Sequence, residues 1–385
     1  MAHSSTVLNQ IVRHLPQGRF QKIVREHNGD RGVRVFKCWN LFLCHMYAQL
    51  SGLDSLRDLE TALRSKSSAL YHLGLKGFAR STMADANESR NPVIFEKMFG
   101  ELVRMATSAA PTHKFKFKNP LYSLDSSTIT LCLSMFTWAK FRARKGALKL
   151  HTLLDHRGHL PSALILTDGK CADITAARRF HFEPDSILVA DRAYVDYCWL
   201  YQLCLQGVWW VTRIKKGMDF QLIERFPVDR STGVTSDWRI RIKGAKADSI
   251  PTDLRRVRYV DPDTGKAYVF ITNIFHLTAK DIADIYKARW DIELFFKWIK
   301  QNLKIKSFFG TSENAVKTQI WCALCVYLMV AYLTFLSNSP FSLSKLLVRV
   351  RANLMEKIEL VFILYQEQQR TRNQDILCQM ELAFE

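Results

Sequence analysis

Apolar and polar residues follow two different patterns along this chain, and the change between them falls near residue 112. Before that point, apolar residues recur at helical spacing in four segments, which are separated by turn residues such as Pro16–Gly18 and Ser51-Gly52. These segments are residues 7–15, 20–27, 34–50 and 55–64. Ser55 followed by Asp58 adds a capping-box pattern at the start of the fourth segment. We therefore expect residues 1–112 to form an all-helical N-terminal region.

Residues 113–214 instead contain short apolar, β-branched runs that are typical of buried strands. Strands are predicted at residues 121–129, 149–154, 163–167, 186–190 and 208–214, and helices at 173–180 and 196–206. Three successive strands followed by alternating helix and strand predict an α/β fold, a mixed sheet with helices on its faces. The preceding run His113–Lys118 alternates basic and aromatic residues, and fits either a linker or an edge strand that contacts phosphates.

The remaining chain divides into three further segments. Residues 215–277 are polar and turn-rich with short alternating runs, which predicts a small β-rich insertion rather than part of the main core. Residues 278–340 hold a long amphipathic helix and then an apolar run at 320–336, which we interpret as a buried core helix rather than a membrane span. Residues 341–385 are predicted to be a C-terminal helical tail.

The amphipathic helix at Asp281–Lys304 carries an unusual polar edge. Thr278 and Asp281 form a capping-box pattern at its start. At about 100° per residue, four polar side chains fall within an arc of roughly 60°. They are Tyr286, Arg289, Glu293 and Lys300. The neighbouring arc is an apolar stripe that faces a core, so we interpret the polar edge as the wall of a groove.

Charge and composition narrow the class of partner. The 385 residues carry a formal net charge of +19, which is too large for a typical metabolic enzyme and indicates a polyanion partner, nucleic acid first. An anionic membrane is the competing partner, but no block of Lys and Arg flanks a spanning segment. The nine cysteines are odd in number and mostly embedded in apolar runs, and the N-terminus lacks an apolar signal core, so a cytoplasmic protein is expected.

Three acidic residues stand out for their positions. Asp125 lies in one predicted strand, Asp191 ends another, and Glu293 lies on the polar edge of the helix. Alone, an aspartate at a strand end is more often a turn or cap residue. Together, three carboxylates suit Mg²⁺ or Mn²⁺, and two such ions could activate an attacking hydroxyl and stabilise a leaving oxygen in phosphodiester chemistry. Arg289 on the same edge is suited to phosphate oxygens.

These residues carry a family resemblance. Tyr286-x2-Arg289-x3-Glu293-x6-Lys300 resembles the Y-R-E-K motif of the insertion sequence 4 family of DDE transposases. DSSTI around Asp125 and ADRAYVD around Asp191 resemble the two aspartate motifs of that family. The resemblance covers roughly Tyr122 to Leu336, and the N-terminal helical region is similar to that of many bacterial members.

The resemblance implies a ribonuclease H-like catalytic domain (113–214 and 278–340) interrupted by the β-rich insertion. It implies cut-and-paste transposition with two metal ions held by Asp125, Asp191 and Glu293. Nicking by water, a hairpin formed by the freed 3′-hydroxyl in the better-understood members, and joining to target DNA would follow. Tyr286 and Arg289 would contact the terminal phosphate or a displaced base, and Lys300 would contact DNA near the cleaved end.

Other DNA contacts are less sharply marked. Hairpin-forming members of the family hold a flipped base against an aromatic residue of the insertion. The aromatic candidates in this chain are Trp209, Trp210, Trp238, Tyr268 and Phe270. Their spacing does not single one out, and we take Trp210 as the predicted DNA contact. Arg80 and Ser81 would enter DNA if the helices around 56–63 and 82–88 form a helix-turn-helix. A zinc site is one interpretation of His151, His156 and His159, but they straddle a predicted hairpin turn without cysteine partners, so we expect ordinary core or surface histidines.

The expected partners are transposon terminal inverted repeats, target DNA and a second copy of the chain, because two ends require two active sites. No membrane partner is expected, and the protein would act at the bacterial nucleoid. Two alternatives remain: a ribonuclease H-like nuclease or resolvase that cuts without joining, and a catalytically inactive DNA-binding descendant.

Overall fold

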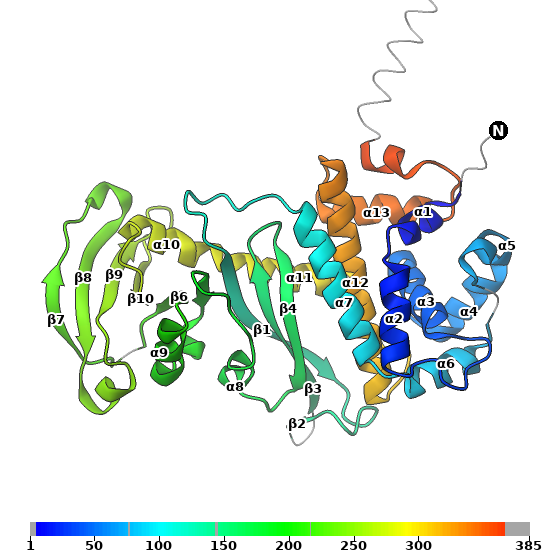
Figure 1. The fold of residues 1–385 in the computed structure, drawn as a ribbon, viewed down its shortest axis with the longest axis horizontal. Coiled ribbons are helices and arrows are strands. Elements are labelled where there is room, and N and C mark those ends of the chain that lie inside the picture. Colours follow the sequence, from blue (N-terminus) through cyan, green and yellow to red (C-terminus); the bar gives the residue numbers. More distant parts are fainter. Residues whose placement is uncertain (1–4, 76–77, 143–144, 216, 366–385) are drawn as a thin grey trace, which may run out of the picture. The chain divides into compact units, whose positions relative to one another are not determined.

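The computed structural model describes residues 5–75, 78–142, 145–215 and 217–365, and the chain forms two compact units (Figure 1). The helical unit comprises Met1–Pro111, Ser134–Trp138 and Trp298–Glu385. The sheet unit comprises Thr112–Leu133 and Ala139–Lys297. The predicted segment 278–340 is therefore shared, because the chain passes from the sheet unit to the helical unit at Lys297–Trp298. Part of the predicted tail, residues 366–385, lies outside the described residues.

The helical unit confirms the predicted all-helical N-terminal region. Its helices are α1 (Val7–Arg13), α2 (Gln17–Glu26), α3 (Cys38–Ser51), α4 (Leu56–Ser65), α5 (Ser67–Leu70), η1 (Tyr71–Leu73), α6 (Arg80–Ser89), α7 (Val93–Ala109), α12 (Glu313–Ser337) and α13 (Leu343–Asn353). The capping pattern at the start of α4 is real, since the Ser55 side chain accepts a hydrogen bond from the Asp58 backbone N–H at 3.1 Å.

Helix α12 is the core of the helical unit. It lies beside α7 and packs against α7 and α3 (Figure 1). The rings of Phe99 on α7 and Trp321 on α12 lie 5.3 Å apart. Among the described residues, α12 is the one helix long and apolar enough to cross a membrane, but 72% of its most apolar window is buried inside the protein. The predicted buried core helix is therefore confirmed.

The region between α4 and α6 differs from a simple helix-turn-helix. The short elements α5 and η1 lie between the two helices, and residues 76–77 are outside the described residues. Helices α4 and α6 still contact each other. The connection is thus longer than the short turn of the DNA-binding motif.

A ten-stranded mixed sheet organises the sheet unit. The strand order is β2-β3-β1-β5-β6-β10-β9-β8-β7, and β4 lies outside this path and pairs with β3. The strands are β1 (Leu121–Leu131), β2 (Lys140–Arg142), β3 (Lys145–Asp155), β4 (Leu160–Asp168), β5 (Ile187–Ala190), β6 (Trp209–Arg213), β7 (Phe220–Arg225), β8 (Val234–Ile242), β9 (Leu254–Val260) and β10 (Ala267–Thr272). Strands β1, β3 and β4 form an antiparallel meander, whereas β1, β5 and β6 are parallel. This is the predicted mixed sheet, in the ribonuclease H-like strand order.

Helices cover both faces of the sheet centre. The helical elements of the sheet unit are α8 (Asp173–Ala177), η2 (Arg192–Tyr194), α9 (Tyr197–Leu205), η3 (Arg230–Thr232), η4 (Gly244–Ser249), α10 (Ala279–Ala288) and α11 (Trp290–Asn302). The C-terminal residues of α11, from Trp298, belong to the helical unit. In β5, Leu188 and Ala190 pack in the core with α9, while Ile187 and Val189 pack in the core with α10. Because side chains alternate across a strand, β5 is buried on both faces, which explains its uninterrupted apolar sequence.

The β-rich insertion is continuous with the central sheet. Strand β10 pairs with β6, from Phe270 opposite Arg213 to Thr272 opposite Val211, and β9, β8 and β7 follow outward. The expectation of an insertion separate from the main core is therefore wrong in this respect. Residues His113–Lys118 form a linker rather than a strand, with the Phe115 and Phe117 rings stacked 5.0 Å apart.

Candidate active site

Strand register places two of the three predicted acids side by side. Leu124 of β1 lies opposite Ala190 of the parallel strand β5, so Asp125 and Asp191 follow at the same level of neighbouring strands. Asp125 lies within β1, while Asp191 directly follows β5 and precedes η2. Alternation along β1 and β5 directs both side chains to the face covered by α10.

The predicted helix Asp281–Lys304 is two helices that meet at Arg289. Helix α10 begins with the predicted capping box of Thr278 and Asp281, and ends at Ala288. At the junction, the Arg289 N–H donates to the Tyr286 carbonyl, and the Ile292 N–H donates to the Arg289 carbonyl, each three residues back. Such tightened hydrogen bonds mark a 3₁₀-like turn, so the helical prediction is right in extent but misses this interruption.

Arg289 at this junction joins the acids. Its guanidinium donates to Asp125 Oδ2 at 3.1 Å and to Glu293 Oε1 at 2.7 Å. One turn earlier, the Tyr286 hydroxyl donates to Asp191 Oδ1 at 3.3 Å. Five residues therefore meet in one site: Asp125, Asp191, Tyr286, Arg289 and Glu293. The first and the last of them are 168 positions apart in the sequence.

The charges in this site are crowded. Burial raises the pKa of Asp125 to about 6, the Ser126 backbone N–H and Arg289 oppose that rise, and the charges of Glu293 and Asp191 add to it. Burial also raises the pKa of the Tyr286 phenol to about 12. Because like charges at close range disfavour joint ionisation, Arg289 between Asp125 and Glu293 stabilises the charged forms of these two carboxylates.

The donor set is suited to a hard divalent ion. Carboxylate oxygens are the ligands that Mg²⁺ and Mn²⁺ prefer, and both ions retain waters. The Arg289 side chain is only 13% exposed, and its Nε has no hydrogen-bond partner. A buried donor without a partner is unusual and is consistent with a site that is completed by another ligand.

A polar cluster supports the strand that carries Asp125. The Ser126 hydroxyl donates to Asp173 Oδ1 at 2.8 Å, and Lys149 Nζ donates to the same oxygen at 3.2 Å. His151 Nδ1 lies 3.6 Å from that oxygen, and burial lowers the pKa of His151 to about 4. These contacts join α8, β3 and β1 directly beside Asp125.

The remaining predicted DNA contacts are placed differently. Lys300 and Arg80 belong to the helical unit; Arg80 is exposed at the first residue of α6, and burial lowers the pKa of Lys300. Trp210 is 1% exposed, and its indole N–H donates to Cys204 Sγ at 3.3 Å within the core. The prediction that Trp210 contacts DNA is wrong, because no ring face is accessible in the folded unit.

An aromatic cavity of about 290 Å³ adjoins the acidic site. Its lining includes Tyr286 and Arg289 from the site, together with Tyr268, Phe270 and Arg213 from the sheet. Phe270 is 2% exposed, whereas Tyr268 is partly exposed under the Arg213 guanidinium, 5.2 Å from its ring centre. Of the aromatic candidates for base stacking, Tyr268 is therefore both accessible and next to the acids.

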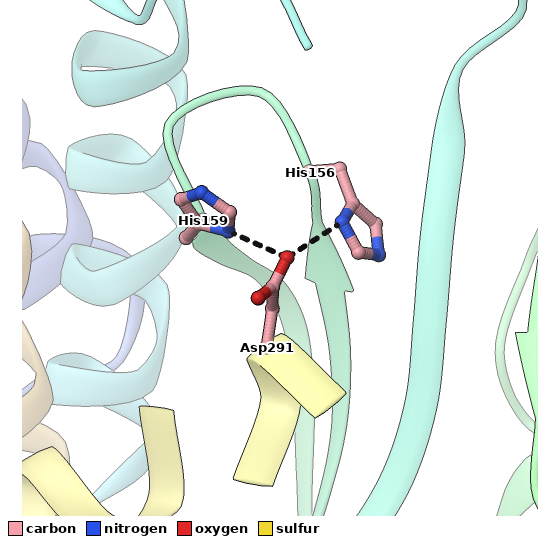
Figure 2. Close-up of side chains that lie close together, drawn as sticks. All are labelled: His156, His159 and Asp291. Carbon is pink, nitrogen blue, oxygen red and sulfur yellow. Dashed lines mark ion pairs between the residues drawn. The ribbon is translucent and has the colours of Figure 1, made fainter. Parts of the chain in front are cut away.

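A second cluster lies at the turn between β3 and β4. Figure 2 shows the imidazoles of His156 and His159 on either side of one carboxylate oxygen of Asp291. Each Nδ1 is 3.3 Å from Asp291 Oδ2. His156 is buried and His159 is exposed, as expected of a core and a surface histidine, but their shared contact with Asp291 was not predicted. Asp291 was missed because its partners lie on another element, with no spacing signal to connect them.

The sheet unit is thus an α/β fold whose mixed sheet and helices α10 and α11 bring three carboxylates together. Residues 116–329 match the family described as transposase DDE domain, and residues 3–76 match a domain of unknown function, DUF4372. This chain belongs to the transposase DDE domain family.

Three relatives agree with this assignment. The y4zB protein of Sinorhizobium fredii, which carries a transposase name, is 31% identical over 64% of this chain and 69% of its own length. A Geobacillus stearothermophilus protein named as the transposase for insertion sequence element IS5377 is 28% identical, over 68% of each chain. A Synechocystis protein named for insertion sequence element IS4SA is 35% identical over 21% of this chain and 24% of its own length.

The protein is thus a transposase, an enzyme that cleaves and transfers DNA and uses divalent metal. The resemblance to insertion sequence transposases is confirmed at the level of the family.

Proposed function

We propose that this transposase performs cut-and-paste transposition, with Asp125, Asp191 and Glu293 as its catalytic metal ligands. The observation that carries the proposal is the pair of hydrogen bonds from Arg289 to Asp125 and Glu293, with Tyr286 bonded to Asp191 beside them. These contacts join Asp125 and Glu293 to one cation, with Asp191 beside them through Tyr286, in a site that is partly open to solvent.

The three carboxylates would hold two Mg²⁺ or Mn²⁺ ions. When bound, such ions lower the pKa of the attacking hydroxyl and stabilise the leaving oxygen in phosphodiester hydrolysis and strand transfer. Arg289, whose guanidinium has five donors, is placed to turn from the carboxylates to phosphate oxygens of the DNA end. Tyr286 orients Asp191 through its hydroxyl.

The proposed DNA contacts include residues of each unit. Tyr286 and Arg289 would contact the terminal phosphate, and Lys300 and Arg80 would contact flanking DNA. Tyr268, at the cavity beside Arg289, would stack on an unpaired base if the ends pass through hairpins. The DNA substrates would be terminal inverted repeats and a target site in the bacterial nucleoid, with a homodimer holding the two ends.

The test uses labelled duplex that carries a transposon end, target plasmid and Mg²⁺. Glu293→Gln should abolish cleavage while end binding, measured by gel shift, stays within about twofold, because amide and carboxylate have similar size but the amide binds metal weakly. Glu183→Gln is the matched control, since Glu183 is an exposed glutamate of the same unit.

The three functions give different results. Cleavage and strand transfer by the wild-type protein support the proposal. Cleavage without joining would indicate a nuclease, and binding alone would indicate an inactive descendant. Cleavage that survives Glu293→Gln would overturn the assignment of Glu293 as a metal ligand.

A further inference from the structure

The cluster of His156, His159 and Asp291 is separate from the carboxylate site. Its donors come from two elements, the β3–β4 turn and the first turn of α11, all within the sheet unit. Their ligand atoms lie within 4.8 Å of one another. None of the three is among the acids assigned above, so the cluster requires its own explanation.

The distances in the cluster suit the ligands of a metal ion as well as they suit long hydrogen bonds. Both Nδ1 atoms lie 3.3 Å from Asp291 Oδ2 (Figure 2), whereas a charge-assisted N–H···O contact spans roughly 2.7–2.9 Å. Zn–N and Zn–O bonds of about 2.0–2.2 Å place the ligands of a tetrahedral ion about 3.3–3.5 Å apart. The two nitrogen–oxygen separations therefore match an edge of a zinc tetrahedron.

The surroundings of His156 can accommodate the tautomer that a metal requires. Its side chain is only 3% exposed, and its Nε2 lies 2.7 Å from the hydroxyl of the buried Ser123. If Nε2–H donates to that hydroxyl, Nδ1 carries the lone pair and faces Asp291. A metal-bound histidine commonly has such a partner on its other nitrogen.

Access and charge complete the set. The His159 side chain is 55% exposed, so solvent reaches the cluster from that side and a water can take a fourth position. The cluster thus presents two imidazoles and a carboxylate, a ligand set that suits zinc and similar borderline ions.

We propose that His156, His159 and Asp291 bind one zinc-class divalent ion, which fastens the β3–β4 turn to the first turn of α11. Glu293 lies two residues beyond Asp291 on that turn, and Ser123, the partner of His156, lies two residues before Asp125 on β1. The ion would therefore hold in place two elements that carry the acids, without contacting the DNA. This inference does not depend on the proposed transposition pathway.

The experiment uses Co²⁺ as a visible probe of the full-length protein after treatment with a chelator. Titration in saturating Mg²⁺ keeps the hard carboxylate site occupied. We expect one equivalent of Co²⁺ to give the intense visible band of a four-coordinate ion with nitrogen ligands, and Zn²⁺ to displace it. Zn²⁺ should also raise the melting temperature of the wild-type protein.

Two variants and one control assign the band. His159→Asn should remove it, and Asn tolerates the left-handed backbone of this position, where φ is +54°. Asp291→Asn should also remove it. His181→Asn, the same substitution at an exposed histidine of the same unit, should leave both the band and the zinc-induced rise in melting temperature unchanged.

Two results would overturn the proposal. One is a wild-type spectrum with only the weak absorption of six-coordinate, all-oxygen Co²⁺. The other is an intense band that survives in His159→Asn and Asp291→Asn, each shown to be folded by circular dichroism. Failure of DNA cleavage would affect neither result, so this site and the proposed function are tested separately.

Discussion

Replacing Arg289 by glutamine should separate its structural role from the binding of metal. The substitution removes the cation between Asp125 and Glu293, whose side chains are 23% and 35% exposed, while Arg289 itself is 13% exposed. Removing one partner of a fully buried pair costs about 3–5 kcal/mol. Since solvent reaches a quarter to a third of each carboxylate, we expect a loss of about 2 kcal/mol in the free energy of unfolding without metal.

The same change should strengthen metal binding. In the wild-type protein, Mn²⁺ must compete with the guanidinium for the two carboxylates. If the loss of this competition makes the free energy of Mn²⁺ binding more favourable by about 1.4 kcal/mol, the dissociation constant for Mn²⁺ falls roughly tenfold. The measurement belongs at pH 8, above the Asp125 pKa of about 6, so that protons do not compete for the site.

The assay combines urea unfolding in chelator with calorimetric titration of Mn²⁺. Arg230→Gln is the control, because Arg230 is an exposed arginine of the same unit. DNA cleavage should still be lost in Arg289→Gln, since the phosphate contact is missing. If Arg289→Gln both binds Mn²⁺ more weakly and unfolds more easily than the wild type, the guanidinium does not compete with Mn²⁺ for the carboxylates. Arg289 would then be a residue that positions them.

Three further outcomes follow from particular contacts. His45 is buried against Asn87, and burial lowers its pKa to about 4. Between pH 6.5 and pH 4 the unfolded chain therefore binds more protons than the folded chain. The free energy of unfolding should fall by roughly 3 kcal/mol as the pH is lowered through this range. Asp237→Asn breaks the buried pair with Arg255 and should cost about 3–5 kcal/mol in urea unfolding. Tyr268→Ala should impair processing of hairpin ends while changing the melting temperature little, because the ring is partly exposed.

Each of these has a direct control. His45→Gln should flatten the pH dependence of unfolding relative to the wild type, and an unchanged slope would exclude His45 as its source. The surface pair of Arg241 and Asp253 is the control for the buried pair of Arg255 and Asp237. Asp253→Asn should lower the free energy of unfolding by less than about 1 kcal/mol. Tyr268→Phe keeps the ring and should retain hairpin processing; if it fails as Tyr268→Ala does, the hydroxyl rather than stacking is responsible.

Local sequence determined the elements of this protein. The capping box at Thr278, the apolar run of β5 and the period of α3 are set by hydrogen bonds and spacing within a few residues, so they were predictable. The polar edge of Tyr286, Arg289 and Glu293 was predictable for the same reason, since it belongs to one stretch of helix.

Only the tertiary structure decided which distant groups meet. The register of Leu124 against Ala190 brings Asp125 beside Asp191, and a turn at Arg289 directs one guanidinium to two of the acids. Asp291 carries no signal of its own, because its histidine partners reach it only through packing of a hairpin turn against α11. Pairing between strands and burial are properties of the whole chain, which is why Trp210 appeared available in the sequence and is enclosed in the fold.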